Sequence, residues 1–232
     1  MAGRNRFGRL LLETLAKKGA APAGVVLECE TPRAASLEQW LAHPSFEPDA
    51  FERTVEQAGI DVLRTSDFQG DAALAWIADQ RPDCLINGGG GIFSKALLDA
   101  TPVGAVNAHP GLLPSYRGLD PVLWALAENG PLGATVHRMA EGLDTGPIFA
   151  SATLPPEMLT PEDLSSVVAL RVACMRRGAQ LLATVLSDPW RYPPTPQDEG
   201  EARYFGRFPE DRLAEVEAAR LSLRAAAQGA VS

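Results

Sequence analysis

The 232-residue sequence predicts an α/β fold with an open, mostly parallel, twisted sheet flanked by helices. Short apolar runs of strand length alternate with amphipathic stretches of helix length. Two polar segments, 88–91 and 107–109, fall where predicted strands end. Ligands of open parallel sheets bind outside the carboxyl ends of the strands, so the fold and the candidate site agree.

The elements of the first half follow from apolar periodicity and from glycine and proline punctuation. Leucines at helical spacing predict a first helix that ends before Gly19. A short apolar run bounded by Pro22 and by charge predicts the first buried strand. In order, we expect a helix at 9–18, a strand at 23–27, a helix at 50–59, a strand at 61–63, a helix at 71–80 and a strand at 84–86.

In the second half, the apolar run 103–109 predicts the strand that ends in the main motif. Asp120 and Thr160 are expected to cap the helices at 120–129 and from 160 to about 186, each with a proline in the first turn. We also expect strands at 134–138 and 147–154, a proline-rich connector at 189–201 and a last helix at 212–227. The predicted organisation is therefore a catalytic domain over 1–187, followed by the connector and C-terminal helix over 188–232.

The composition is that of an ordinary globular enzyme, with 46% hydrophobic and 22% charged residues. No apolar run approaches the ~20 residues of a membrane span. The basic N-terminus lacks a secretory apolar core, which predicts a cytoplasmic protein without a membrane partner. Three scattered cysteines have no metal-like spacing, so no metal site is expected.

The formal net charge is −8 and the isoelectric point is near 5.0. Such a charge opposes generic binding to a phosphate backbone, and no dense basic patch with interleaved aromatic residues is visible. A nucleic-acid partner is therefore not expected.

Asn107 and His109 stand two residues apart at the end of an apolar strand, so both side chains point to the same face. Asp144 follows in a second, glycine-bounded loop, 142–146. Together they offer an oxyanion donor, an ionisable imidazole and an acid that tunes it, which an acyl transfer to an amine requires. The structural alternatives are an Asn in a strand-end turn, a hydrogen-bonding His and a turn Asp.

The run Asn107-Ala-His109-Pro110, with Leu113-Pro114, Arg117-Gly118 and the later Asp144-Thr145-Gly146, resembles the formyltransferases that use 10-formyltetrahydrofolate. That family includes glycinamide ribonucleotide, methionyl-tRNA and sugar-amine formyltransferases, and a formyltetrahydrofolate hydrolase. The resemblance is dense over about residues 82–150. It implies a Rossmann-like, formyltransferase-like fold and an enzyme of one-carbon metabolism that takes its formyl group from 10-formyltetrahydrofolate.

The resemblance also implies that two loops hold the pterin ring through main-chain groups, although a plain flexible turn is the alternative for the glycine run. The expected folate-binding residues are Gly88, Gly89, Gly90, Gly91, Ile92, Met139, Glu141, Gly142 and Leu143. Arg117, Tyr116 and Asn5 are the expected substrate-binding residues, with loop pinning as the alternative role of Arg117.

The predicted reaction is formyl transfer to a primary amine of a small metabolite, either an amino sugar or an amine derived from an amino acid. Methionyl-tRNA members of the family carry a C-terminal domain for which only about 45 residues are left after the long helix. The alternatives are formyltetrahydrofolate hydrolysis and a non-catalytic folate-binding paralogue. The charged last helix predicts either a homodimer element or a solvated face.

One feature departs from the family pattern. Members begin with an apolar strand, whereas residues 1–8 of this sequence look like the turn that follows it. The first strand is therefore expected to be missing. Loss of a central strand would leave ladder groups of its neighbours without partners, which costs stability.

Overall fold

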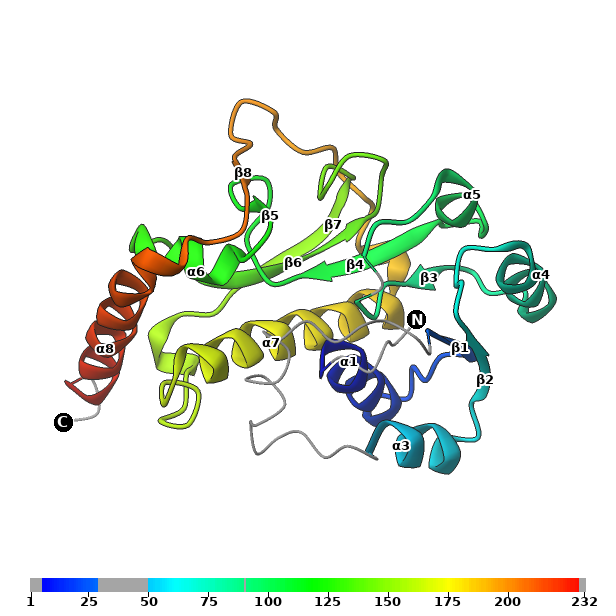
Figure 1. Cartoon of the computed structure of the whole chain (residues 1–232), viewed down its shortest axis with the longest axis horizontal. Helices are drawn as coiled ribbons and strands as arrows, with labels where there is room; N and C mark the ends of the chain where they lie inside the picture. Colours follow the sequence, from blue (N-terminus) through cyan, green and yellow to red (C-terminus); the bar gives the residue numbers. More distant parts are fainter. Residues whose placement is uncertain (1–5, 29–49, 90, 230–232) are drawn as a thin grey trace. The chain divides into compact units, whose positions relative to one another are not determined.

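The computed structural model of the chain describes residues 6–28, 50–89 and 91–229 (Figure 1). The chain divides into two compact units, which are described separately. Unit 1 comprises residues 1–107 and 138–141, and unit 2 comprises residues 108–137 and 142–232. The boundary falls within strand β4 (Ala105–His109), between Asn107 and Ala108.

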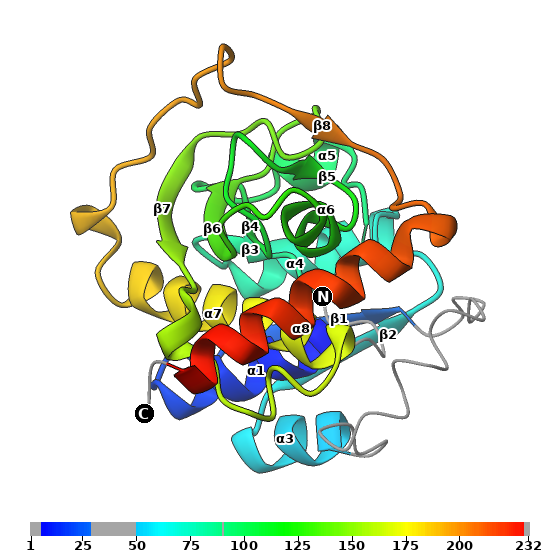
Figure 2. The same ribbon diagram turned by 90° about the vertical axis from the view of Figure 1, so that its left-hand side faces the viewer.

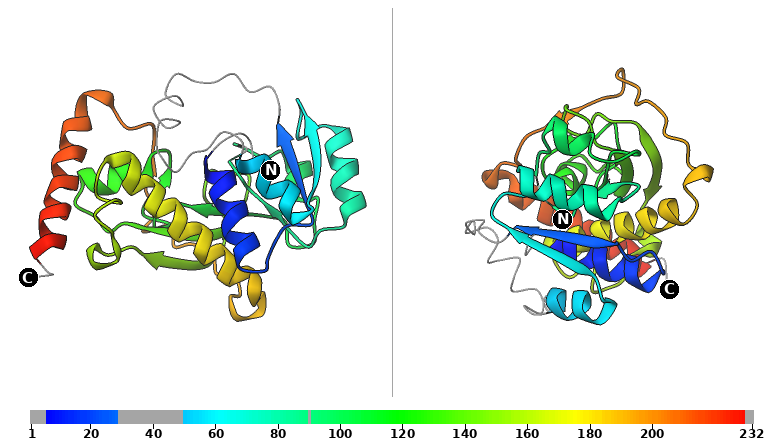
Figure 3. Two further views of the ribbon diagram at one scale, coloured as in Figure 1. Left: turned by 90° about the horizontal axis from the view of Figure 1, so that it is seen from below. Right: turned by 90° about the vertical axis from the view of Figure 1, so that its right-hand side faces the viewer.

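In unit 1, strands β1 (Gly24–Glu28) and β2 (Asp61–Thr65) form a parallel pair, in which Val25 is opposite Val62. Figure 3 shows them side by side. Helices α1 (Arg6–Lys17) and α3 (Ala50–Ala58) contact each other. Their apolar side chains pack with β1 in one small core, formed by Leu12, Val25, Leu27, Val55 and Ile60.

The rest of unit 1 contains α4 (Asp71–Gln80), β3 (Leu85–Ile86), the short α5 (Lys95–Leu98) and the start of β4. Strands β3 and β4 are parallel, and Leu85 is opposite Ala105. A second core joins α4 and α5 to these strands through Phe68, Ala73, Ile77, Phe93, Leu97 and Ala105. This core supports the glycine turn that follows β3.

Among the described residues, β1 and β3 belong to separate sheets. Both line a cavity of about 370 Å³, together with Leu11 and Leu15 of α1 and Ile77 of α4. Mostly apolar side chains thus surround a space bordered by two strands. Helix α1 begins at the first described residue, so the missing first strand stays a prediction.

Unit 2 begins with the end of β4 and carries the remaining elements (Figure 2). They are β5 (Arg117–Gly118), α6 (Pro121–Ala127), β6 (Gly133–Arg138, of which Arg138 belongs to unit 1), β7 (Ile148–Thr153), α7 (Val167–Ser187), β8 (Tyr204–Phe205) and α8 (Leu213–Gly229). Three short 3-10 turns, at Pro156–Met158, Pro189–Arg191 and Glu210–Arg212, separate the later elements. Strands β6 and β7 are antiparallel, whereas β5 and β8 are parallel.

Helix α7 approaches the strands of unit 2 closely through Gly178. A Cβ atom at this position would lie 3.3 Å from Cβ of Ala134 and 3.4 Å from Cβ of Ala108. The core of unit 2 brings α6, α7 and α8 together, with Leu170, Cys174 and Val216 completely buried. The last helix therefore packs one face against the protein.

The predicted α/β class with mostly parallel strands is confirmed, since β1–β2, β3–β4 and β5–β8 are parallel. The predicted cap at Thr160 was wrong. Helix α7 begins at Val167, where Ser166 accepts from the amide of Ala169, because Thr160 instead forms a separate turn with Asp163. No described helix is long and apolar enough to cross a membrane.

Asp120 occupies the predicted N-cap position of α6, before Pro121, but it does not cap the helix through its side chain. Its backbone is left-handed, with φ of 50°, and its side chain makes no capping hydrogen bond. The carboxylate instead accepts from Arg171 and from the amide of Phe208. Asp120 therefore joins α6 to later parts of unit 2 rather than terminating its own helix. The two-residue strands β5 and β8 were not predicted, because neither has an apolar run.

Candidate active site

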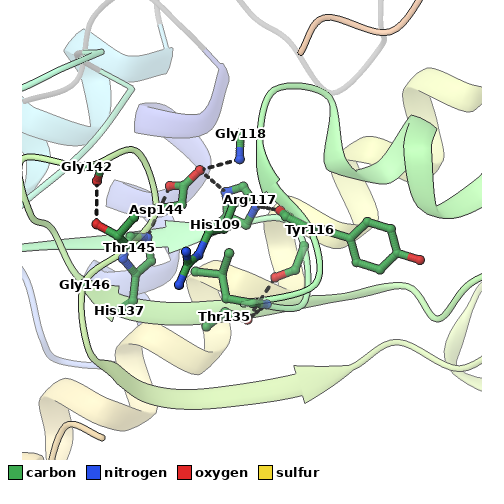
Figure 4. A network of polar contacts seen from close by, with 12 residues as sticks. His109, Tyr116, Arg117, Gly118, Thr135, His137, Gly142, Asp144, Thr145 and Gly146 are labelled. Atoms are coloured by element: carbon green, nitrogen blue, oxygen red, sulfur yellow. Dashed lines mark hydrogen bonds and ion pairs between the residues drawn. The ribbon is translucent and has the colours of Figure 1, made fainter. Parts of the chain in front are cut away.

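His109 ends β4 within unit 2, and its ring is held on both sides (Figure 4). Nδ1 lies 3.5 Å from Oδ2 of Asp144, and Nε2 lies 2.7 Å from the carbonyl oxygen of Tyr116. A carbonyl only accepts, so Nε2 must donate its proton there. The residue is only 4% exposed, which fixes the ring orientation by packing as well as by hydrogen bonding.

Asp144 lies in the loop between β6 and β7 with a left-handed backbone, φ of 56°. Its Oδ2 accepts from the amide of Gly118 at 2.9 Å. Gly118 itself needs to be glycine, because φ is 99° and a Cβ would lie 2.2 Å from the carbonyl oxygen of Phe205. The Arg-Gly pair of the motif thus places a backbone N–H where it can hold the carboxylate.

His137 of β6 is the partner of Asp144 that the sequence analysis missed. Its Nε2 lies 3.5 Å from Oδ1 of Asp144, and the residue is 1% exposed. The rings of His137 and His109 are 6.4 Å apart and nearly perpendicular, with an interplanar angle of 81°. It lies in the predicted strand 134–138, and the sequence analysis gave it no role. A histidine inside an apolar strand was the signal that it had a buried partner.

The charge state of the site follows from burial and from the two histidines. Burial lowers the pKa of His109 and outweighs Asp144, which acts to raise it. Burial acts to raise the pKa of Asp144, but His137, His109 and the Gly118 amide together hold it below its ordinary value. Near neutral pH a neutral His109 ring therefore faces an ionised Asp144 carboxylate.

Arg117 and Tyr116 contact other parts of unit 2. The fully buried Arg117 side chain donates to Gln197, Glu199 and Tyr204. The Tyr116 ring stacks on Phe205, with centroids 5.7 Å apart, and points away from His109 (Figure 4). These contacts support loop pinning as the role of Arg117. Asn5 lies outside the described residues.

The expected folate-binding residues fall in both units. In unit 1, Gly89 and Gly91 have φ of 103° and 74°, and Asn87 Oδ1 accepts from the amide of Gly89 at 2.8 Å. Ile92 beside them is 76% exposed. Gly88 is buried, Met139 is half-buried and Glu141 is exposed, whereas Gly90 lies outside the described residues. The turn needs glycine for its conformation and presents an apolar side chain, which fits a flat ligand.

The remaining predicted residues, Gly142 and Leu143, belong to unit 2, and both are exposed. Asn107, half-buried in β4, is the last residue of the first segment of unit 1. The convergence of Asn107 with His109 and Asp144, and of the two loops on one ring, stays a prediction.

The described cysteines do not add a nucleophile. Burial raises the pKa of Cys174 to about 12 and also raises the pKa of Cys84. Both thiols therefore stay protonated and unreactive near neutral pH. Among the described residues, no group of three His, Cys, Asp or Glu side chains is arranged to hold a metal ion.

Comparisons with known proteins identify the family of this chain. The sequence profile of the formyl transferase family matches residues 5–175. A methionyl-tRNA formyltransferase of Dehalococcoides mccartyi is 31% identical over 215 residues, which cover 90% of this chain and 64% of the relative. One from Thermus thermophilus is 37% identical over 159 residues, 68% of this chain and 50% of the relative. The chain thus spans about half to two thirds of the length of these relatives.

Solved structures show the same fold. A sugar N-formyltransferase from a Shewanella species has a TM-score of 0.59 at 18% identity, over 96% of this chain and 85% of its own. Glycinamide ribonucleotide transformylase 1 from Symbiobacterium toebii has a TM-score of 0.56 at 22% identity, over 85% of this chain and 92% of its own. Because the family profile matches residues 5–175, the chain belongs to the formyl transferase family.

Proposed function

We propose that the protein transfers a formyl group from 10-formyltetrahydrofolate to a primary amine of a small metabolite, an amino sugar or an amine derived from an amino acid. The observation that supports this most is the Asp144 carboxylate, held by His109, His137 and the Gly118 amide inside the family motif. An ionised acid buried against a neutral imidazole is an arrangement for moving a proton.

In this reaction the amine nitrogen attacks the formyl carbon, and the bond from that carbon to the folate nitrogen breaks. The carboxamide of Asn107 is the proposed donor to the oxyanion, a role typically worth about 10²–10³ in rate. His109 has a bare Nδ1 in the resting state, because its proton is on Nε2, toward Tyr116. A proton that reaches Nδ1 has the Asp144 carboxylate 3.5 Å away as its counter-ion.

The attacking amine loses one proton and the departing folate nitrogen gains one, so the site has to relay a proton without net change. His109 and Asp144 are the proposed relay, and His137 holds the far oxygen of the carboxylate. The folate supplies the one-carbon unit. The chain supplies position and electrostatics.

For the folate, the glycine turn 88–91 with exposed Ile92 and the loop around Leu143 are the proposed binding segments. Ile92 and Leu143 are 76% and 47% exposed. Exposed apolar side chains beside backbone groups that glycine leaves accessible suit a flat heterocycle with hydrogen-bonding edges. Both segments stand in the matched part of the chain.

Methionyl-tRNA is the second candidate acceptor, favoured by the relatives at 31% and 37% identity that are named for it. The net charge of −8 favours the small amine, because tRNA brings a dense row of phosphates. The same carboxylate and imidazole would also activate water, which would give formate in place of a formylated amine.

The test is to incubate the full chain with 10-formyltetrahydrofolate and an acceptor panel, and to measure tetrahydrofolate release and the mass of the formylated product. The panel contains nucleotide-linked amino sugars, amines derived from amino acids, and methionyl-tRNA. We expect product with a small amine, formed about 10²–10⁴ times more slowly by D144N. Product with methionyl-tRNA alone, or formate without an amine, would replace the proposed acceptor. No turnover with any acceptor or water would overturn the proposal.

A further inference from the structure

A segment beyond the family match touches the candidate active site. Residues 195–205, here called the strap, follow the matched range, which ends at residue 175. Thr195 and Ile148 exchange two backbone hydrogen bonds of 2.8 Å, and β8 at the other end of the strap pairs with β5. The strap is therefore fixed at both ends within unit 2. Between these ends, Gln197 and Glu199 bind residues next to the candidate active site.

Gln197 of the strap uses both ends of its amide. Nε2 donates to the carbonyl oxygens of Asp144 and Gly146, at 2.8 and 2.7 Å. Oε1 accepts from Nε of Arg117 at 3.0 Å. An amide has two N–H donors, so both are committed to the main chain of one turn. No other natural side chain of this length supplies two donors and an acceptor at these positions.

The turn that Gln197 holds is the one that needs support. Asp144 has a left-handed backbone, with φ of 56°, a conformation that is unfavourable for most residues with a side chain. Such a conformation persists where surrounding contacts hold it in place. The Gln197 bonds fall on the carbonyl of Asp144 itself and on Gly146 two residues later. They fix the backbone that directly follows the left-handed Asp144.

Arg117 completes the connection between the strap and the carboxylate. Its guanidinium forms a bidentate pair with Glu199, at 2.7 and 2.9 Å, and donates to the Tyr204 hydroxyl at 2.6 Å. The next residue, Gly118, donates its amide to Asp144 Oδ2. The strap thus holds both the turn that carries Asp144 and the strand that presents the amide to its side chain.

We propose that Gln197 is a positioning residue of the active site, which holds the Asp144 turn so that the carboxylate faces His109, His137 and the Gly118 amide together. The effect on turnover rests on the proposed function, whereas the effect on the turn does not. Gln197 acts through Asp144 and is not itself expected to touch the reacting atoms. Glu199 has a lesser part, because its side chain is 71% exposed and its ion pair with Arg117 is open to solvent.

The experiment compares Q197A and Q197E with Q180A. Gln180 is an exposed glutamine of α7 in the same unit, so its loss controls for a generic change of residue type. With the amine that the wild type uses, we expect kcat to fall about 10- to 100-fold in both Gln197 variants and KM for the donor to change less than 3-fold, the size of effect typical of a misplaced catalytic group. In E199Q, kcat should fall less than 5-fold, because the ion pair between Glu199 and Arg117 is open to solvent.

The second readout needs no substrate, so it separates failure of this proposal from failure of the proposed function. Histidine side chains are titrated by NMR in wild type, Q197A and Q180A. The groups that face His109 are the Asp144 carboxylate, the His137 ring and the Tyr116 carbonyl. We expect the His109 titration to move to lower pH in Q197A, because the carboxylate recedes, and to stay in Q180A.

An inactive wild type with a shifted His109 titration would sink the proposed function and keep the positioning role. A His109 titration in Q197A at the same pH as in the wild type would overturn the positioning role, whatever the activity of the variant. Equal losses of kcat in Q197A and Q180A would overturn it too. If Q197A fails to fold, Q197E carries the kcat comparison, because it keeps the side-chain shape and replaces the two donors with a charged oxygen that cannot donate to the Asp144 and Gly146 carbonyls.

Discussion

Oδ1 of Asp144 lies 3.5 Å from Nε2 of His137, while Oδ2 of the same carboxylate faces His109. One acid therefore serves two buried imidazoles, and the Gly118 amide holds it in place. The Asp144 carboxylate thus couples His109, which belongs to the family motif, to His137, which does not. A substitution of Asp144, His109 or His137 should therefore alter the electrostatic environment of the other two side chains.

Replacement of Asp144 by Asn should lower kcat by about 10²–10⁴, the usual contribution of a positioned acid–base group. Asn keeps the shape but removes the charge that receives the proton at His109. Steady-state turnover with the active amine measures the loss. The matched control is Asp188→Asn, because Asp188 is exposed and makes no side-chain capping bond. Equal rates for D144N and wild type would remove Asp144 from the mechanism.

Replacement of His137 by Asn should raise the pKa of His109. His137 is one of the groups that lower that pKa, and its replacement removes this electrostatic effect. NMR titration of the histidine side chains reads the change directly. A pH profile of kcat should move in the same direction. A His109 titration that stays in place would show that the two rings are not coupled.

The free energy of unfolding should rise with pH across two windows. Both His109 and Asp144 have folded-state pKa values below their ordinary values of 6.5 and 3.8. Between its folded-state and ordinary pKa, each group binds more protons in the unfolded chain than in the folded protein. Its contribution to the free energy of unfolding is therefore fully present above the ordinary pKa, and it is lost as the pH falls through the folded-state pKa. Urea unfolding between pH 7 and 5 tests the upper window. His109→Asn should flatten it, and an unchanged slope in that variant would contradict the assignment.

An added apolar segment that fills the cavity bordered by β1 and β3 should stabilise the protein. An apolar segment of five residues, rich in Val and Ile and joined before residue 1, should raise the free energy of unfolding. Each buried side chain contributes about 1.5–3 kcal/mol and ordering costs about 1–2 kcal/mol per residue, so a net gain on the order of 1–3 kcal/mol is expected. Urea denaturation measures it.

The control for that segment is one of equal length made of Gly, Ser and Pro, which neither fills the cavity nor pairs with a strand edge. The apolar segment should also lower the amide exchange of Val25 and Leu85, residues of the two bordering strands. A midpoint that is the same for both segments would show that the cavity does not accept a strand.

The sequence predicted most elements of this fold within a few residues, since apolar periodicity survives wherever an element has a buried face. It failed where two local signals competed. Thr160 and Ser166 are both good caps, and only the packing of α7 decides between them. Strands β5 and β8 have two residues each, and their pairing depends on a contact between distant segments.

Some residues of the candidate site were identified from the sequence, and others were found only in the structure. His109 and Asp144 were identified from the motif, and the structure brings them together. His137 and Gln197 were not, because their significance lies in which atoms they reach rather than in their neighbours in sequence. Arg117 was expected at a substrate, and its partners in the strap show why a buried guanidinium supports a loop instead.

The sequence by itself determined the α/β class and the family motif, because hydrophobic period and the order of chemically specific residues are local properties. The tertiary structure decided the charge state of the site and the group that holds the Asp144 turn. Both depend on burial and on contacts between residues far apart in the chain: burial makes His109 neutral despite its acid, and a glutamine 53 residues after Asp144 fixes the backbone that carries that acid.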